Sequence, residues 1–345
     1  MKILIAGLGS IGQRHARNLR LLCGRDLELI TYRTRGLPQV ITPDLKIKPD
    51  ATIESEYHFR TYAHLEEALA QKPDAVMVCN PNSMHLPLAL AAAQAGCHLF
   101  IEKPLSHNLE GVAALTDLIE KKRLVCLVGY QLRFHPGLKI VKSLLDSGAI
   151  GHTISVRMVF GEYIPHWHQY EDYRQYHAAR QDQGGGVILS QIHDLDFIYA
   201  LFGLPRRVFA LGGKLSSLEV DVEDTASILM DFLVAGRPVP IHVSQDYVQR
   251  PPVRRCDIVG DSGTITWDYY NLMVQVERPR EGISETYRFD RFDRNQLFLD
   301  ELRHFLNCLQ GLETPVVNIH DGANSLKMAL AAKESLATGR IVTLD

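Results

Sequence analysis

The glycine-rich turn that follows the first apolar run constrains the fold most strongly. Residues 3–6 (ILIA) are typical of a buried parallel strand, and the segment GLGSIG at residues 7–12 follows them directly. In this GxGxxG pattern the glycines permit a tight turn, the close approach of a pyrophosphate and the packing of a helix on the strand. A helix over residues 10–22 would direct its positive N-terminus at the phosphates. A chance glycine-rich turn is the simpler alternative. The pattern predicts a dinucleotide site at Gly7, Gly9, Ser10, Ile11 and Gly12.

Composition favours a two-domain protein without a strongly charged partner. The chain has 345 residues, of which 46% are hydrophobic, and a formal net charge of -3. These values suit two domains with separate cores and give no electrostatic reason to expect binding to nucleic acid or a membrane surface. The apolar runs are too short to span a membrane, and the six cysteines lack CxxC spacing. We therefore expect a cytoplasmic protein with reduced thiols.

The end of the second expected strand is where a dinucleotide fold distinguishes its cofactors. This strand covers residues 27–32, and Arg33, Thr34 and Arg35 follow it. An acidic residue here would bind the 2′-hydroxyl of NAD, whereas two guanidinium groups suit a 2′-phosphate. Arg33 and Arg35 therefore favour NADP over NAD, with a solvated pair of surface arginines as the alternative. Residues 36–57 are polar and proline-punctuated, which predicts a long, loosely structured connection.

Alternating strand and helix patterns predict an α/β fold whose first domain, residues 1–125, is a doubly wound parallel Rossmann sheet. The further strands are expected at residues 75–79, 98–101 and 124–129, and the helices at residues 64–71, 84–95 and 109–121. Ligands of such sheets lie at the carboxyl ends of the strands. The side chains expected there are Asn80, Pro81, Asn82, His85, Glu102, Lys103, Pro104 and those of residues 130–134.

Residues 126–345 are predicted to form a substrate-binding and oligomerisation domain of the α+β type. Period-two strands are expected at residues 153–160, 207–214, 226–232, 238–245, 255–259 and 264–268. Short glycine-containing turns between them predict a large, mainly antiparallel open sheet. Because partner subunits often cover such a sheet, we expect a homodimer or homotetramer. A helix over about residues 322–338 is expected to pack back on the first domain.

Several separated motifs resemble those of the Gfo/Idh/MocA oxidoreductases, which include glucose–fructose oxidoreductase and inositol dehydrogenase. The motifs are GLGSIGQRH from residue 7, CNPNSMH from residue 79, AGCHLFIEKPLS from residue 95, GYQLRFHP from residue 129 and GGGVILSQIHDLD from residue 184. The resemblance implies hydride transfer between NAD(P) and a secondary alcohol or ketone carbon of a sugar, polyol or nucleotide-sugar. The spacing of Trp167, Asp172 and Tyr176 before the triple glycine resembles a subgroup acting on sugars of surface polysaccharides or sialic-acid-like pathways.

The resemblance also implies roles for individual residues. Lys103, with a pKa lowered by desolvation, would exchange the proton that accompanies hydride transfer, and His193 would hydrogen-bond or protonate the sugar oxygen. A surface lysine and a structural histidine are the simpler alternatives. The resemblance implies that the proline after Lys103 follows a cis peptide bond. The implied contacts on the nicotinamide side are Asn80, Pro81, His85, Glu102 and Lys103.

One position departs from the family pattern. Many relatives carry an aspartate three or four positions before the histidine, where this chain has Leu189 and Ser190. Three explanations stay open at the level of sequence. Asp194, Asp172 or Tyr176 substitutes for the carboxylate, or the reaction needs only the lysine and the histidine, or the site no longer turns over.

An aromatic and charged segment, residues 163–176, is suited to a sugar-binding wall. Aromatic faces stack on sugar rings, while Arg174 and Arg180 suit a carboxylate or phosphate; a subunit-contact loop is the alternative. The predicted substrate residues are Lys103, Tyr130, Arg133, Trp167, Asp172, Tyr176 and His193. We expect no metal, because His166-x-His168 alone is a weak ligand pattern and the family chemistry needs none.

Two other functions compete with a sugar dehydrogenase. A sensor that binds the dinucleotide without reacting is favoured by the lost aspartate and opposed by the presence of both Lys103 and His193. A glycosidase that uses tightly held NAD in a redox-neutral cycle is also implied by the family resemblance. Release of reduced cofactor distinguishes the dehydrogenase from both.

Overall fold

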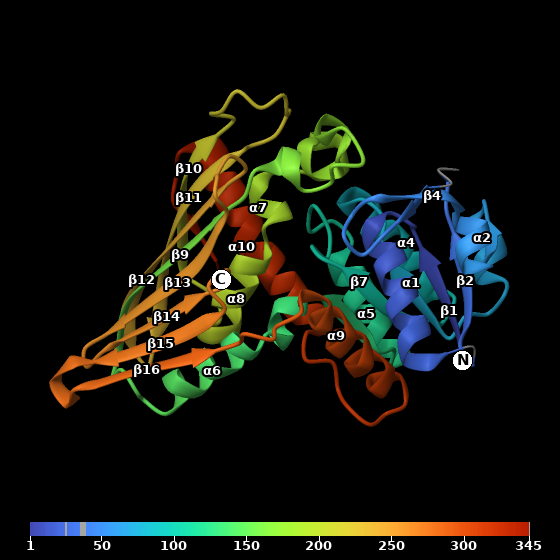
Figure 1. Cartoon of the computed structure of the whole chain (residues 1–345). Coiled ribbons are helices and arrows are strands. Elements are labelled where there is room, and N and C mark those ends of the chain that lie inside the picture. Colours follow the sequence, from blue (N-terminus) through green and yellow to red (C-terminus); the bar gives the residue numbers. More distant parts are fainter. Residues whose placement is uncertain (25, 35–38, 345) are drawn as a thin grey trace.

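The chain folds into two α/β units that lie side by side (Figure 1). The computed structural model describes residues 1–24, 26–34 and 39–344. In the first unit, six parallel strands have the order β5-β2-β1-β6-β7-β8. These strands are β1 Lys2–Ala6, β2 Glu28–Tyr32, β5 Arg60–Tyr62, β6 Ala75–Val78, β7 His98–Glu102 and β8 Cys126–Gly129. The chain therefore has the predicted Rossmann-type doubly wound sheet.

Helices of the first unit follow the predicted alternation, while its end lies later than expected. The helices are α1 Ser10–Cys23, α3 Leu65–Leu69, α4 His85–Gln94 and α5 Val112–Lys122. The strand β8 is wholly buried and pairs in parallel with β7, which places Leu127 beside Phe100. The parallel sheet therefore extends to Gly129, beyond the boundary that we expected at residue 125.

The segment after β2 is more ordered than the sequence suggested. We expected a loosely structured connection over residues 36–57, but the described part contains β3 Gln39–Ile41, β4 Ile47–Thr52 and α2 Ile53–Tyr57. That prediction was wrong because a few apolar side chains suffice to fix these short elements. Val40 and Ile53 are buried in the core that α1 shares with the first sheet. Each element is too short to show a period in the sequence.

A nine-stranded sheet with the order β16-β15-β14-β13-β9-β12-β11-β10-β17 forms the second unit. Every strand pair is antiparallel except β9 with β12, so the sheet is mixed but mainly antiparallel. The strands are β9 Thr153–Gly161, β10 Arg207–Gly213, β11 Thr225–Val234, β12 Arg237–Asp246, β13 Val253–Gly260, β14 Thr264–Asp268, β15 Met273–Arg278, β16 Ile283–Arg288 and β17 Val342–Thr343. We did not predict β15 or β16; β16 is mostly exposed at the sheet edge and lacks a strong apolar alternation.

The helices of the second unit lie between its sheet and the first unit (Figure 1). They are α6 Pro136–Asp146, α7 Val187–Ser190, α8 His193–Phe202, α9 Arg294–Leu309 and α10 Ile319–Thr338. The expected C-terminal helix is α10, which starts at residue 319 because Asn318 and Asp321 form a capping box. Its Gly322 lies close to Val128 of β8. A second helix also returns, since α9 buries Leu302 and Phe305 against the first sheet.

Among the described helices, none is both long and apolar enough to cross a bilayer.

Candidate active site

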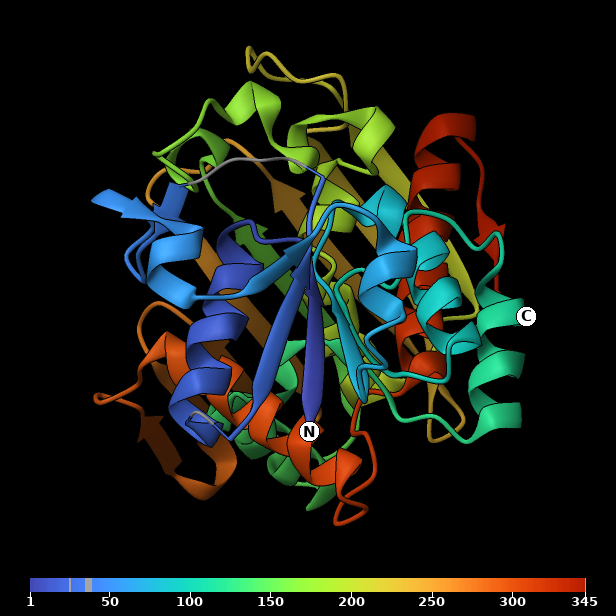
Figure 2. The same cartoon turned by 90° about the vertical axis from the view of Figure 1, so that its right-hand side faces the viewer.

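A cavity of about 730 Å³ lies between the two units at the carboxyl ends of the parallel strands. In Figure 2 the strands of the first unit run upward from the N-terminus, and the segment that follows β9 lies above their far ends. The cavity wall combines the glycine-rich turn, Arg33 at the end of β2, Lys103 at the end of β7 and His193 at the start of α8. This is the edge at which doubly wound sheets bind their ligands.

The glycine-rich turn has the geometry that a pyrophosphate requires. Gly7 has φ +97°, and a Cβ there would lie 2.7 Å from the carbonyl oxygen of Cys79. A Cβ on Gly12 would lie 2.0 Å from the carbonyl oxygen of Gly7, so this glycine brings α1 close to the turn. Gly9 faces open space, and within the described chain no side chain caps α1 there. Since the first turn of α1 also lacks acidic residues, its amide groups suit an anionic ligand.

The strand ends beside the turn are fixed by buried polar contacts. The ring nitrogens of His85 lie 2.8 Å and 2.7 Å from the carbonyl oxygens of Asn80 and Pro104, and burial lowers the pKa of this histidine. His15 of α1 lies 2.6 Å from a carboxylate oxygen of Glu102. These contacts hold the ends of β6 and β7 against α1. Asn80, Pro81, His85 and Glu102 all line the cavity, as do Gly7, Gly9, Ser10 and Ile11.

Lys103 has a backbone carbonyl as its partner. Its ammonium donates to the carbonyl oxygen of Ser190, at a distance of 2.9 Å, and its peptide bond to Pro104 is cis. Burial lowers the pKa of Lys103 to about 8, an effect that the nearby Glu102 carboxylate partly opposes. The Ser190 carbonyl carries only a partial negative charge, so it orients the Lys103 amine with less stabilisation of the ammonium than a carboxylate would give. Lys103 can therefore hold or release a proton near neutral pH.

His193 faces the same space from the other unit. Burial, and next the positive charge of Lys103, hold the pKa of His193 well below its ordinary value, so the imidazole is neutral at neutral pH. Its Nδ1 is buried and has no hydrogen-bond partner in the described part of the chain. Tyr130 lies behind it, with the two rings 5.7 Å apart in an edge-to-face arrangement.

Three of the predicted substrate residues lie away from the cavity wall. Tyr130 is fully buried behind the His193 ring. Arg133 instead donates two hydrogen bonds to Asp196, at 2.7 Å and 2.9 Å. Asp172 is exposed and pairs with Arg174. Trp167 and Tyr176 do line the cavity, whereas Gly12 serves packing and Arg35 lies outside the described residues.

The candidates for the missing carboxylate are engaged elsewhere. The buried Asp194 accepts a hydrogen bond of 2.9 Å from Nε of Arg254. Asp172 pairs with Arg174 at the surface, and the Tyr176 hydroxyl donates to the carbonyl oxygen of His168. In place of a side-chain carboxylate, Lys103 contacts the backbone of Ser190, one of the two positions where relatives carry the aspartate.

Other wall residues escaped the sequence reasoning. They are Glu162, His177, Arg254, Tyr269, Tyr270, Arg294 and Phe298. Apart from the pairs Tyr269–Tyr270 and Arg294–Phe298, they come from separate segments and share no motif, so only the tertiary fold assembles them. The sequence pattern around Arg254 could have indicated this residue. Arg254 lies on the same face of β13 as the buried Cys256 and Ile258, and an arginine is unusual on a buried face. Its guanidinium lies over the ring of Phe160.

A dinucleotide cradle on a parallel sheet, beside a half-buried lysine and a buried histidine from the second unit, defines a Rossmann-type oxidoreductase. Residues 1–130 match the family described as "Oxidoreductase family, NAD-binding Rossmann fold", and residues 138–266 match the GFO/IDH/MocA C-terminal domain. The chain belongs to the Gfo/Idh/MocA oxidoreductase family.

Known proteins with the same organisation span the full chain. Myo-inositol 2-dehydrogenase of Thermotoga maritima is 29% identical over 100% of this chain and 99% of its own length. The scyllo-inositol 2-dehydrogenase (NAD(+)) of Bacillus subtilis is 25% identical over 100% of this chain and 96% of its own. The structure of the WlbA dehydrogenase from Bordetella pertussis, in complex with NADH and UDP-GlcNAcA, has a TM-score of 0.79 at 21% identity and covers 100% and 99% of the two chains.

Proposed function

We propose that this oxidoreductase transfers a hydride between a nicotinamide dinucleotide and the secondary alcohol or ketone carbon of a sugar, polyol or nucleotide-sugar. The observation that carries the proposal is Lys103, which lines the cavity beside the dinucleotide cradle with a pKa of about 8. Two relatives that align over 99% and 96% of their own length are named inositol 2-dehydrogenases, and this supports the substrate class. A place in surface-polysaccharide or sialic-acid-like sugar metabolism remains part of this proposal.

The chain's own residues fit the dinucleotide. Gly7, Gly9, Ser10 and Ile11 would hold the pyrophosphate, because Gly9 faces open space at the N-terminus of α1. Arg33 would lie at the adenosine ribose. Asn80, Pro81, His85 and Glu102 would contact the nicotinamide side of the cavity. When bound, the nicotinamide supplies or accepts the hydride.

Lys103 would perform the proton transfer. In alcohol oxidation the neutral amine takes the hydroxyl proton as the hydride leaves the carbon, and in ketone reduction the ammonium returns that proton to the oxygen. Both forms are populated near neutral pH because the pKa is about 8. His193, which is neutral, would bind the same oxygen by a hydrogen bond without adding charge. The Ser190 carbonyl positions the amine.

The opposite wall would bind the sugar ring. Trp167 and Tyr176 contribute aromatic surface, and Glu162 and Arg254 contribute groups that accept from and donate to hydroxyls. We do not place Tyr130, Arg133 or Asp172 in direct contact with substrate, since they are buried or paired away from the wall.

The outer face of the large sheet would form the subunit contact. Leu211, Leu229 and Leu233 are 61%, 51% and 51% exposed and lie on the face opposite the helices. Such exposed apolar side chains on one sheet face suit a self-complementary interface, as in a homodimer or homotetramer. We also propose that the protein is cytoplasmic, in keeping with its free cysteines.

The test is binding of NADH and NADPH by calorimetry, followed by absorbance in the reduced-nicotinamide band with a panel of inositols, sugars and nucleotide-sugars. A substrate-dependent absorbance change is expected for one class in the panel. Tight binding without any change across the panel would contradict hydride transfer and favour a sensor. Substrate cleavage without net change in absorbance would favour the redox-neutral glycosidase.

A further inference from the structure

At the adenosine end of the cavity, the wall residue Arg33 belongs to an ion pair that no sequence motif predicted. The guanidinium of Arg33, at the end of β2, pairs with the carboxylate of Glu54 on α2. We infer that Glu54, acting through Arg33, makes this site prefer a dinucleotide with a free 2′-hydroxyl, NAD(H), over one with a 2′-phosphate. The inference rests on the proposed function, since it assumes that the cavity holds a nicotinamide dinucleotide.

The position of Arg33 makes it relevant to the adenosine ribose. Its backbone amide donates to the carbonyl oxygen of Tyr62 at 3.2 Å, which fixes it to the edge of the parallel sheet. Arg33 and Thr34 line the cavity together with Gln39 and Ile41 of the β3 segment. In dinucleotide folds the residue at the end of this strand contacts the 2′ position of the ribose.

The ion pair with Glu54 reduces the net positive charge that Arg33 presents to a ligand. The Arg33 side chain lines the cavity and is 12% exposed, whereas Glu54 pairs with it from outside the cavity wall and is 51% exposed. A 2′-phosphate would bring close to two negative charges toward the Glu54 carboxylate and would have to draw Arg33 away from it. A 2′-hydroxyl has no charge and can donate a hydrogen bond to that carboxylate. The sequence-based preference for NADP therefore loses the support of Arg33.

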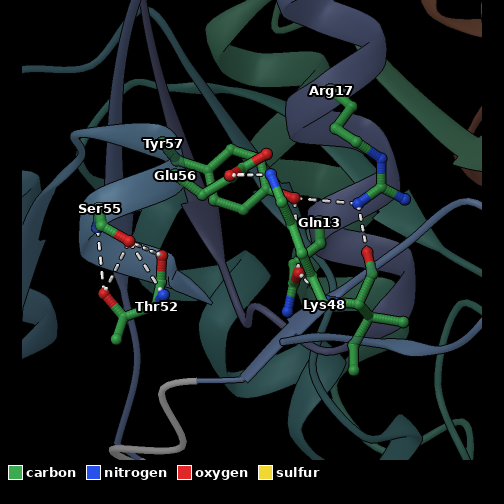
Figure 3. Close-up of polar contacts among 8 residues, drawn as sticks. Gln13, Arg17, Lys48, Thr52, Ser55, Glu56 and Tyr57 are labelled. Atoms are coloured by element: carbon green, nitrogen blue, oxygen red, sulfur yellow. Dashed lines mark hydrogen bonds and ion pairs between the residues drawn. The ribbon is translucent and has the colours of Figure 1, made fainter. Parts of the chain in front are cut away.

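The helix that carries Glu54 is held in place against α1 (Figure 3). Thr52 and Ser55 form a capping box at its start. At its end, the Tyr57 hydroxyl accepts a hydrogen bond of 2.9 Å from Arg17, which also donates to the carbonyl oxygen of Ile41 at 2.7 Å. Because α1 also carries the phosphate cradle, Glu54 has a defined position relative to the bound ligand.

The chain offers a matched control for this carboxylate. Glu56 lies two residues further along α2 and pairs with Lys48 at 2.6 Å. Replacing Glu54 or Glu56 by glutamine removes the same charge from the same helix, but only Glu54→Gln removes the carboxylate that pairs with Arg33. Thermal melting of each variant would establish that α2 remains folded, and Glu54→Ala provides a second variant with the same expected shift.

The experiment measures dissociation constants of NADH and NADPH by calorimetry for the wild type, Glu54→Gln, Glu56→Gln and the double variant Glu54→Gln/Arg33→Ala. The wild type should bind NADH more tightly. Glu54→Gln should strengthen NADPH binding roughly 10- to 100-fold, the range of one charge-assisted contact, and change NADH binding only a few-fold. Glu56→Gln should leave the ratio unchanged, and the double variant should lose the gain.

Two results would overturn the inference alone. They are tighter binding of NADPH than of NADH by the wild type, and an unchanged ratio of the two affinities in both Glu54→Gln and Glu54→Ala. Failure of the wild type to bind either dinucleotide would contradict the proposed function itself, and the inference would fall with it.

Discussion

The charged groups at the two ends of the cavity are governed by different effects, desolvation at one end and ion pairing at the other. At the nicotinamide end, Lys103 is half-buried and His193 is buried, and desolvation lowers the pKa of both groups. At the adenosine end, Arg33 and Glu54 lie near solvent and control charge by pairing. Proton transfer benefits from a shifted pKa, which desolvation provides at this end of the cavity. Discrimination between a hydroxyl and a phosphate requires only a fixed charge at the entrance. The difference shows how one cavity serves chemistry and selection with separate residues.

The largest effect is expected from removing the proton-transfer group. Lys103→Ala should lower turnover by about 10²- to 10⁴-fold, because the neighbouring His193 has a pKa well below its ordinary value and is a poor substitute for the amine, while dinucleotide binding stays within a few-fold. Steady-state rates and calorimetry on the same preparation would show this separation. Lys142→Ala is a matched control, since Lys142 is exposed on α6 and pairs with Asp146. Retention of turnover within a few-fold in Lys103→Ala would remove this residue from the mechanism.

A second comparison separates folding from binding within the glycine-rich turn. Gly12→Ala places a Cβ 2.0 Å from the Gly7 carbonyl oxygen, so the free energy of unfolding should fall by about 1–3 kcal/mol. Gly9→Ala meets nothing within 4 Å and should leave stability unchanged, yet weaken dinucleotide binding by about tenfold because its methyl group enters the cradle. Chemical denaturation and calorimetry would measure the two effects. Equal loss of stability in both variants would contradict this assignment.

The smallest expected effect is on stability and comes from a buried acid near the nicotinamide end of the cavity. Glu301 of α9 is fully buried, and neither carboxylate oxygen has a partner among the described residues. Burial raises its pKa well above the ordinary value, so the folded protein holds this proton to a higher pH than the unfolded chain does. This difference costs stability as pH rises above about 4.5. Glu301→Gln should therefore raise the free energy of unfolding at pH 7 by about 1 kcal/mol.

The same variant should show little gain at pH 4, where the acid is protonated in both the folded and the unfolded states. Denaturation at the two pH values would test the difference. A gain of equal size at both would mean that the glutamine improves packing rather than relieving ionisation.

Features encoded within one segment were predictable from the sequence. The cradle at Gly7 and Gly9 and the lysine at the end of β7 depend on a strand followed directly by a turn. Features that join distant segments were not predictable. The contact of Lys103 with Ser190 uses a backbone carbonyl, which leaves no trace in residue identity. Likewise, Glu54, which pairs with Arg33, lies on a five-residue helix within a segment expected to be loosely structured.

The most direct test of the account is the pH dependence of alcohol oxidation in the wild type and in Ser190→Asp. We expect the wild-type rate to rise with pH through an inflection near 8, as Lys103 loses its proton. Ser190 lines the cavity and its backbone carbonyl contacts the amine, so a carboxylate introduced at this position should stabilise the ammonium and move the inflection to higher pH. An inflection near 8 that persists in Lys103→Ala, or one that Ser190→Asp does not move, would contradict the proton-transfer role of a desolvated Lys103.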